Sequence, residues 1–158
     1  MSEQRRAVID RFTGPHAFLS NFYPCRVTFN GMTFPSVEAA FQAAKCADPK
    51  DRMRFLTLEP AQAKRLGRRV KMRPDWDARK LTIMHNLLVH KFEENPSLIS
   101  KLLNTGGAVL VEGNTWHDNF WGCCTCARCG GQHGRNNLGR LLMRLRAEYM
   151  SRVGGTSL

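Results

Sequence analysis

Helix-start signals recur through the middle of this 158-residue chain and constrain its fold more than any other feature. Asp48–Pro49 and Asn95–Pro96 each place a capping side chain before a proline at the first helical position. Further helix starts are marked by Pro35–Ser36, Pro60 and Asp75. We expect the Asp48–Pro49 helix to run to about Leu58, and Gly106–Gly107 to end the helix that begins at Asn95–Pro96. The middle of the chain is therefore predicted to be mostly helical.

Apolar spacing supports two of the longer helices. The helix capped by Asp75 has an apolar stripe that should be buried, formed by Leu81, Met84, Leu88 and Phe92. A final amphipathic helix is predicted from Asn137 to Met150, with an inward face formed by Leu138, Leu141, Leu142 and Leu145. Both patterns are typical of helices that pack on one core.

Strand signals are few. Ala7–Phe12, Arg26–Phe29 and Ala108–Gly113 are short apolar segments, and Asn30–Gly31 is the residue pair that type I′ hairpin turns prefer. The order of strands, many helices, strand and helix predicts an α+β fold, a predominantly helical single domain with a small β-sheet. We expect one domain over residues 1–150 and a disordered tail over residues 151–158.

Composition narrows the class of protein. Hydrophobic residues make up 42% and charged residues 23% of the chain, as in ordinary globular proteins. No apolar run approaches the roughly 20 residues that a membrane span needs, and the first residues lack the layout of a signal peptide. We therefore expect a cytoplasmic protein with no membrane partner.

The net charge of +11 is the unusual quantity. Many of the basic residues lie between Lys64 and Lys80 and again between Arg135 and Arg152. A positive field of this size concentrates nucleic acid or a polyphosphorylated small molecule near the protein. A basic surface without any partner is the alternative.

Three polar side chains share one face of the helix that begins at Ser36. Glu38, Gln42 and Lys45 follow one another at helical spacing, with Phe41 on the neighbouring apolar face. A carboxylate, an amide and an amine beside an apolar stripe indicate one wall of a site. A solvated helix face is the alternative that the spacing alone leaves open.

Recognisable motifs are spread over almost the whole chain. They are FLSNFYP at Phe18–Pro24, FPSVEAAFQAAK at Phe34–Lys45, AKRLGR at Ala63–Arg68, RPDW at Arg73–Trp76, KF at Lys91–Phe92, LLNTG at Leu102–Gly106, LVE at Leu110–Glu112, DNFWG at Asp118–Gly122 and NNLGRLLMRLR at Asn136–Arg146. Together they resemble the NADAR family of small N-glycosidases, also called YbiA-like. No single motif is decisive, but their number and order make the match specific. The resemblance implies hydrolysis of N-glycosidic bonds in ribose-phosphate substrates. The family's known substrates are riboflavin-pathway intermediates and ADP-ribose attached to guanine.

Hydrolysis of such a bond requires groups that stabilise positive charge at the sugar's C1 and activate a nucleophile. The resemblance implies catalytic roles for Glu38 and Lys45, and Asp118 is the second carboxylate that the motifs place well. Glu38 lies in the first turn of its helix, where the dipole favours a carboxylate. Lys45 either attacks C1 and forms a Schiff base or makes a phosphate, hydroxyl or ion-pair contact.

Further residues are expected to bind substrate. Trp76 and Trp121 offer indole faces on which a base can stack, although core packing is the commoner fate of tryptophan. Asn21 and Asn136 suit hydrogen bonds to ribose or phosphate. Backbone amides near the start of the last helix could bind an anion. The remaining expected substrate-binding residues are Gln42, Gly122 and Gly139.

The segment CCTCARC contains four of the six cysteines. Cys124, Cys126 and Cys129 have a spacing that suits a structural zinc ion, with His117 or His133 as fourth ligand. No second pair of ligands is evident, so a reduced cysteine-rich loop without metal is the preferred interpretation, and no cofactor is expected to be required.

The sequence thus predicts an N-glycosidase that acts on a ribosylated base, with ADP-ribose on guanine in nucleic acid as first substrate. A phosphoribosyl-aminopyrimidine intermediate of riboflavin synthesis is the alternative substrate. A non-enzymatic reader of ADP-ribose or an NAD-derived nucleotide is the alternative class, and it would need neither Glu38 nor Lys45.

Overall fold

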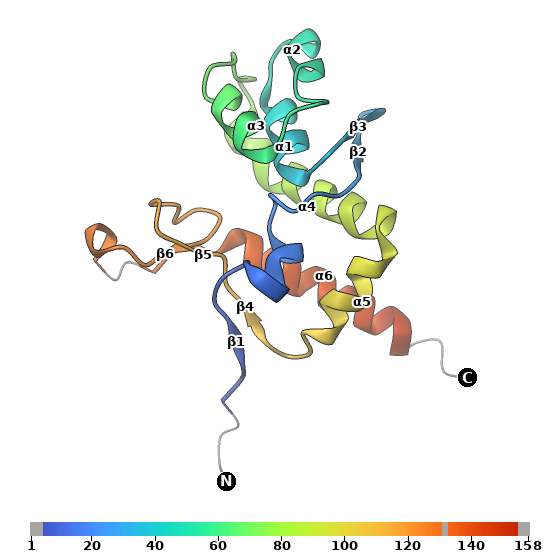
Figure 1. Cartoon of the computed structure of the whole chain (residues 1–158), viewed down its shortest axis with the longest axis vertical. Coiled ribbons are helices and arrows are strands. Elements are labelled where there is room, and N and C mark those ends of the chain that lie inside the picture. Colours follow the sequence, from blue (N-terminus) through green and yellow to red (C-terminus); the bar gives the residue numbers. More distant parts are fainter. Residues whose placement is uncertain (1–4, 131–132, 155–158) are drawn as a thin grey trace. The chain divides into compact units, whose positions relative to one another are not determined.

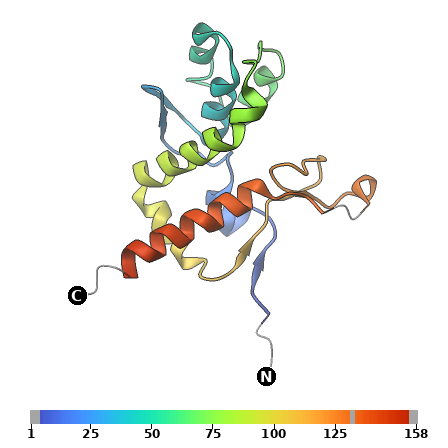
Figure 2. The same cartoon turned by 180° about the vertical axis from the view of Figure 1, so that it is seen from behind.

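The computed structural model describes residues 5–130 and 133–154, and these residues form two compact units. The central unit runs over Asn21–Ser97, and the discontinuous unit combines the chain up to Ser20 with the chain from Leu98 onwards. The elements are helical for the most part and the strands pair two by two, which confirms the predicted α+β class (Figures 1 and 2). None of the helices in the described ranges is both long and apolar enough to cross a membrane.

The central unit is built around helix α1 (Val37–Lys45), which packs against α3 (Pro60–Gly67) and α4 (Trp76–Glu94). Ser36 starts α1 as predicted, because its hydroxyl accepts a hydrogen bond from the amide of Ala39 at 3.1 Å. All residues of α1 except Lys45 are buried. The short helix α2 (Pro49–Met53) follows α1 directly.

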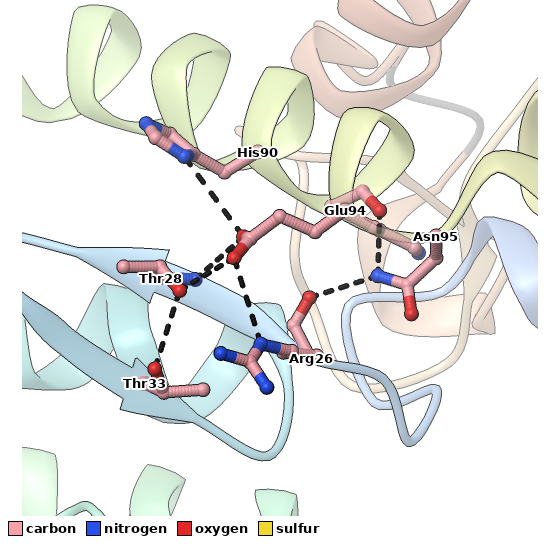
Figure 3. Close-up of polar contacts among 7 residues, drawn as sticks. Arg26, Thr28, Thr33, His90, Glu94 and Asn95 are labelled. Atoms are coloured by element: carbon pink, nitrogen blue, oxygen red, sulfur yellow. Dashed lines mark hydrogen bonds and ion pairs between the residues drawn. The ribbon is translucent and has the colours of Figure 1, made fainter.

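The hairpin of β2 (Val27–Phe29) and β3 (Met32–Phe34) is antiparallel, and its predicted turn at Asn30–Gly31 is confirmed by positive φ angles of 51° and 76°. Figure 3 shows how the end of α4 fastens this hairpin. The carboxylate of Glu94 accepts hydrogen bonds from the amide and the hydroxyl of Thr28, the former at 2.7 Å. Next to it, the Asn95 side chain donates to the carbonyl of Arg26 at 2.8 Å.

The core of the central unit contains a lysine. Lys91 on α4 is fully buried, and its amine lies 5.6 Å from the ring centre of Phe92 and 5.9 Å from that of Tyr23. Burial lowers the pKa of Lys91 to about 8, against a small opposing effect of Cys25. The sequence placed Lys91 in the KF motif but did not predict its burial, although it follows Met84 and Leu88 at helical spacing.

The buried lysine predicts a pH-dependent stability. The pKa of Lys91 is about 8 in the folded chain and near its usual 10.5 when unfolded, so the unfolded chain binds more protons between these values. The free energy of unfolding should therefore rise by about 2 kcal/mol between pH ~7.5 and ~9.5 from this residue. Lys91→Met should remove that rise, measured by urea unfolding at both pH values. The exposed Lys50→Met is the matched control and should keep it. Equal pH slopes in wild type and Lys91→Met would contradict the assignment.

The discontinuous unit pairs the N-terminal segment with the chain after α5 (Pro96–Asn104). Strand β1 (Val8–Ile9) runs parallel to β4 (Val109–Leu110), and α6 (Asn137–Gly154) packs on β4. A 3₁₀ helix, Gly14–Leu19, buries Phe18 and Leu19 in the same unit.

Arg146 on α6 anchors this packing. Its buried guanidinium donates to the hydroxyl of Thr105 at 2.8 Å and to the carbonyl of Ala108 at 2.7 Å. A second parallel pair, β5 (Gly113–Asn114) with β6 (Cys123–Cys124), lies near the start of α6, and a 3₁₀ turn follows at Ala127–Cys129 (Figures 1 and 2).

Several predicted boundaries were wrong. The second helix stops at Met53 rather than near Leu58, because the amides from Arg54 onwards bond carbonyls three residues back, as in turns. Of the segment Ala7–Phe12 only Val8–Ile9 pairs, because its partner β4 has just two residues.

The remaining differences concern two helix faces and the C-terminus. Leu81 was predicted to be buried, but its exposed fraction is 43%, since α4 turns Ile83 and Leu87 towards the core instead. Leu141 is half-buried, whereas the other predicted positions on α6 are buried. The last helix continues to Gly154, so residues 151–154 of the predicted tail are helical, and residues 155–158 lie outside the described part of the chain. The single-domain interpretation of residues 1–150 stays a prediction.

Candidate functional site

Helix α1 holds the polar face that the sequence predicted. Glu38 and Gln42 are both buried, with exposed fractions of 8%, and the Gln42 side-chain amide donates to Glu38 Oε1 at 2.9 Å. Lys45 is half-buried, two turns further along the helix. The alternative of a solvated helix face is therefore wrong for Glu38 and Gln42. A buried carboxylate held by a neutral amide keeps a fixed orientation.

Asn21 lies at the start of α1. Its backbone carbonyl accepts a hydrogen bond from the backbone amide of Glu38 at 3.0 Å. Its side-chain nitrogen donates to the sulfur of Met84 at 3.6 Å. Two buried side-chain oxygens, Asn21 Oδ1 and Gln42 Oε1, have no hydrogen-bond partner in the part of the chain that the structure describes. Buried acceptors without partners are uncommon, and both belong to residues predicted to bind substrate.

A glycine on the neighbouring helix determines where Gln42 lies. A Cβ atom at Gly67 on α3 would overlap the side-chain amide of Gln42. The glycine leaves the space that the Gln42 side-chain amide occupies, and a larger residue would displace that amide. The sequence offered a signal, a lone glycine inside a helical pattern, but its packing role was not predicted.

The surroundings of Lys45 lower the pKa of its amine. Burial lowers the pKa of the Lys45 amine below the usual 10.5, and the nearby Arg68 lowers it further, while Cys46 and Glu38 act in the opposite direction. A lowered lysine pKa increases the fraction of uncharged amine that can act as a nucleophile near neutral pH.

Trp76, the first residue of α4, packs beside this helix. Its indole lies 4.8 Å from the ring of Phe41 on α1, with the two planes at 52°. The exposed fraction of Trp76 is 6%, so in this structure most of its surface contacts protein. The sequence predicted that a base stacks on Trp76. In the structure Trp76 lies beside α1, next to Phe41.

Asp118 in the discontinuous unit has a clear structural role. Its carboxylate Oδ1 accepts hydrogen bonds from the amides of Phe120 and Trp121 at 3.1 and 2.9 Å. The Asn114 side chain donates to the backbone carbonyl of Asp118 at 2.8 Å and accepts from the backbone amide of Asp118 at 3.1 Å. These contacts build the DNFWG turn, and a catalytic role of Asp118 stays a prediction.

Asn136, predicted to bind substrate, uses its side chain to link the start of α6 to the β4 segment. The side chain accepts from the amide of Glu112 at 3.0 Å and donates to the carbonyl of Leu110 at 2.9 Å. A Cβ atom at Gly139 would collide with the same Leu110 carbonyl, and one at Gly122 would collide with Glu112. The two glycines allow close backbone approaches, which is a packing role.

Trp121 is half-buried and meets Phe120 edge to face, with ring centres 4.8 Å apart. The predicted site residues thus fall into two groups. One group gathers on or beside α1 in the central unit: Asn21, Glu38, Gln42, Lys45 and Trp76. The other lies on the turn and helix start of the discontinuous unit: Asp118, Trp121, Gly122, Asn136 and Gly139.

The cysteine segment forms the one candidate metal centre found among residues 5–130 and 133–154. It combines His117 with Cys124, Cys126 and Cys129. His117 is thus the partner of the three cysteines, and His133, the other predicted fourth ligand, is not in the group.

Comparisons with known proteins agree on one family. The NADAR domain model matches residues 10–150. N-glycosidase YbiA of Escherichia coli (strain K12) is 39% identical over 134 residues, which cover 82% of this chain and 79% of that protein. The solved NMR structure of the E. coli protein YbiA has a TM-score of 0.79 and 32% identity, covering 98% of this chain and 91% of that one.

Two longer proteins also match. A riboflavin biosynthesis protein of Vibrio vulnificus is 40% identical over 136 residues, covering 84% of this chain. The chloroplastic riboflavin biosynthesis protein PYRR of Zea mays is 38% identical over 154 residues, covering 85% of this chain. The chain spans only 35% and 23% of the length of these two relatives.

Proposed function

The chain belongs to the NADAR family, and we propose that it is an N-glycosidase that hydrolyses the bond between ribose C1 and the nitrogen of a base. The names of its relatives of similar length support this activity. The observation that carries the proposal is the arrangement on α1, where a buried Glu38 is held by Gln42 on the helix that ends with Lys45.

The chemistry needs a negative charge near C1, since cleavage of the glycosidic bond builds positive charge there. Glu38 supplies a carboxylate at a fixed position, because Gln42 bonds one of its oxygens. The carboxylate of Glu38 can stabilise C1 or take a proton from an attacking water. Asn21 and Gln42 also present oxygens that can accept hydrogen bonds from ribose hydroxyls.

Lys45 offers a second route. Its neutral amine attacks C1, the bond from C1 to the base breaks, and the base leaves with a proton. The ring then opens to a Schiff base between C1 and the lysine nitrogen, which water hydrolyses to free sugar and free amine. The lowered pKa of Lys45 supports this route, since only the neutral amine is a nucleophile.

As substrate we propose ADP-ribose attached to guanine in nucleic acid. The net charge of +11 supports a polyanionic partner. Part of this charge belongs to the same unit as α1, and Arg68, directly after α3, lowers the pKa of Lys45 through its own charge. Exposed basic side chains on and after α3 include Arg65, Arg68, Arg69 and Lys71. A phosphate backbone near these side chains would place a modified base close to α1.

Phosphoribosyl-aminopyrimidine intermediates of riboflavin synthesis are the second candidate. The names of the Vibrio vulnificus and Zea mays relatives support them, and so does the shared need for cleavage at a ribose C1.

Mass spectrometry of reaction products tests the proposal. The purified protein is incubated with ADP-ribosylated DNA and, in parallel, with the aminopyrimidine intermediate. Free ADP-ribose together with intact guanine is the expected result, and release of ribose phosphate from the second substrate alone would favour the riboflavin alternative. Binding of ADP-ribose without any product would contradict the enzymatic proposal and support a nucleotide reader.

A further inference from the structure

Three thiols and one imidazole converge in the loop that follows the DNFWG turn. Each residue offers one ligand atom: a ring nitrogen of His117 and the sulfurs of Cys124, Cys126 and Cys129. These four atoms all lie within 4.8 Å of one another. We propose that these four residues bind a zinc ion, and that this ion is structural. The inference is independent of the glycosidase proposal, because it concerns the discontinuous unit and not the chemistry on α1.

The distances suit a tetrahedral ion. With Zn–S bonds of ~2.3 Å and Zn–N bonds of ~2.0 Å, ligand atoms in such a site lie roughly 3.5 to 3.8 Å apart. His117 Nδ1 lies 3.2 Å from Cys126 Sγ and 3.4 Å from Cys129 Sγ. Shifts of a few tenths of an ångström would open these contacts to the spacing of zinc ligands.

The backbone around the cluster is arranged for thiolates. The amides of His117 and Cys126 donate to the sulfur of Cys124 at 3.3 and 3.5 Å, and the side chain of Asn119 donates to that of Cys129 at 3.5 Å. Donors aimed at sulfur stabilise its negative charge and fix the ligands from outside, as such contacts do in zinc sites. The side-chain oxygen of Asn119 also accepts a hydrogen bond from the amide of Cys124 at 2.9 Å. Asn119 therefore contacts two of the proposed ligands, Cys124 and Cys129.

The conformation of His117 supports the same role. Its φ of 68° is in the left-handed region, which is uncommon for residues other than glycine. This conformation directs its amide to Cys124 while its ring reaches Cys126 and Cys129. Local strain of this kind persists where the surroundings determine the conformation, as metal ligation would.

The ligand set indicates zinc in a closed site. Three thiolates and one imidazole are a usual set for structural zinc, and four protein ligands leave no position for water or substrate. Cys123 stands apart, since its thiol points to the carbonyl of Gly134 at 3.6 Å and it is not part of the group. The ion would join the loop before β6 to the 3₁₀ turn after it, and Asp118 and its turn directly follow the ligand His117.

Metal analysis of the full chain, purified under reducing conditions without chelator, tests the proposal. Near-stoichiometric zinc is expected in the wild type and in Cys123→Ser, the matched control. Cys126→Ser/Cys129→Ser should lose most of the zinc. Zinc that persists in the double variant, or a wild type that contains no zinc and takes up none, would overturn the assignment.

Cobalt substitution keeps the test decisive if the double variant does not fold. Wild-type protein stripped of metal and loaded with Co²⁺ should show the visible bands of a tetrahedral ion and a thiolate-to-metal charge-transfer band. His117→Ala should retain the charge-transfer band but shift the visible bands, because one nitrogen ligand is replaced. An octahedral cobalt spectrum without thiolate bands would contradict the site.

Discussion

Glu38→Gln should reduce the rate of base release by ~10²–10⁴-fold, the usual cost of losing a positioned acid or base. The substitution keeps the size of the side chain and removes its charge. The new amide oxygen can still accept the hydrogen bond that Gln42 donates at 2.9 Å, so the packing around α1 should survive. Single-turnover kinetics on the substrate identified by mass spectrometry measure the loss, and thermal melting reports whether the fold is intact.

Glu93→Gln is the matched control, since Glu93 is an exposed carboxylate on α4 in the same unit. It should leave the rate near that of the wild type. If Glu38→Gln is as active as this control, the assignment of the α1 site is wrong. If Glu38→Gln loses activity and also melts much earlier, the carboxylate serves the fold rather than the reaction.

Lys45→Arg should abolish turnover if Lys45 is the nucleophile. Arginine retains the positive charge but stays protonated, so it cannot attack C1. In the wild type, borohydride added during turnover should reduce the Schiff base and leave a stable sugar adduct on the peptide that carries Lys45. The rate should also rise with pH as the amine loses its proton, at a pH below that of an ordinary lysine, because burial lowers the pKa.

The exposed Lys50 supplies the control for this experiment. Lys50→Arg should remain active and should still be trapped, whereas Lys45→Arg and Lys45→Ala should do neither. An active Lys45→Arg protein without any trapped adduct would reduce Lys45 to an electrostatic contact. Glu38 with an activated water would then be the mechanism.

Local patterns explain why much of the fold was predictable. A cap such as Ser36, a turn such as Asn30–Gly31 and the prolines at helix starts act within a few residues, so their effects can be read along the chain. The polar face of α1 was predictable for the same reason, since helical spacing alone places Glu38 and Gln42 together. The same spacing placed Met84, Leu88 and Phe92 of α4 correctly in the core. Leu81 was assigned to the wrong face, because packing against neighbouring segments decides how far the buried stripe extends.

The spacing of the cysteines allowed three of them to be zinc ligands, although a reduced loop without metal was the preferred interpretation. It also left the fourth ligand open between His117 and His133. The choice of His117 depends on a left-handed backbone and on a loop that returns to Cys129, and neither has a signal in the order of residues. The contacts of Asn136 also had no signal in the order of residues. Both ends of its side chain bond the β4 segment, and its role in substrate binding stays a prediction.

The sequence by itself therefore determined the family, the α+β class and the residues of the α1 face, because each rests on short-range spacing or on motif order. Tertiary structure alone decided that Glu38 is buried, that Gly67 lets α3 reach Gln42 and that Lys91 lies inside the core. These are properties of close approach between segments far apart in the chain. They depend on which surfaces pack together, and packing follows from the whole set of contacts rather than from any local pattern.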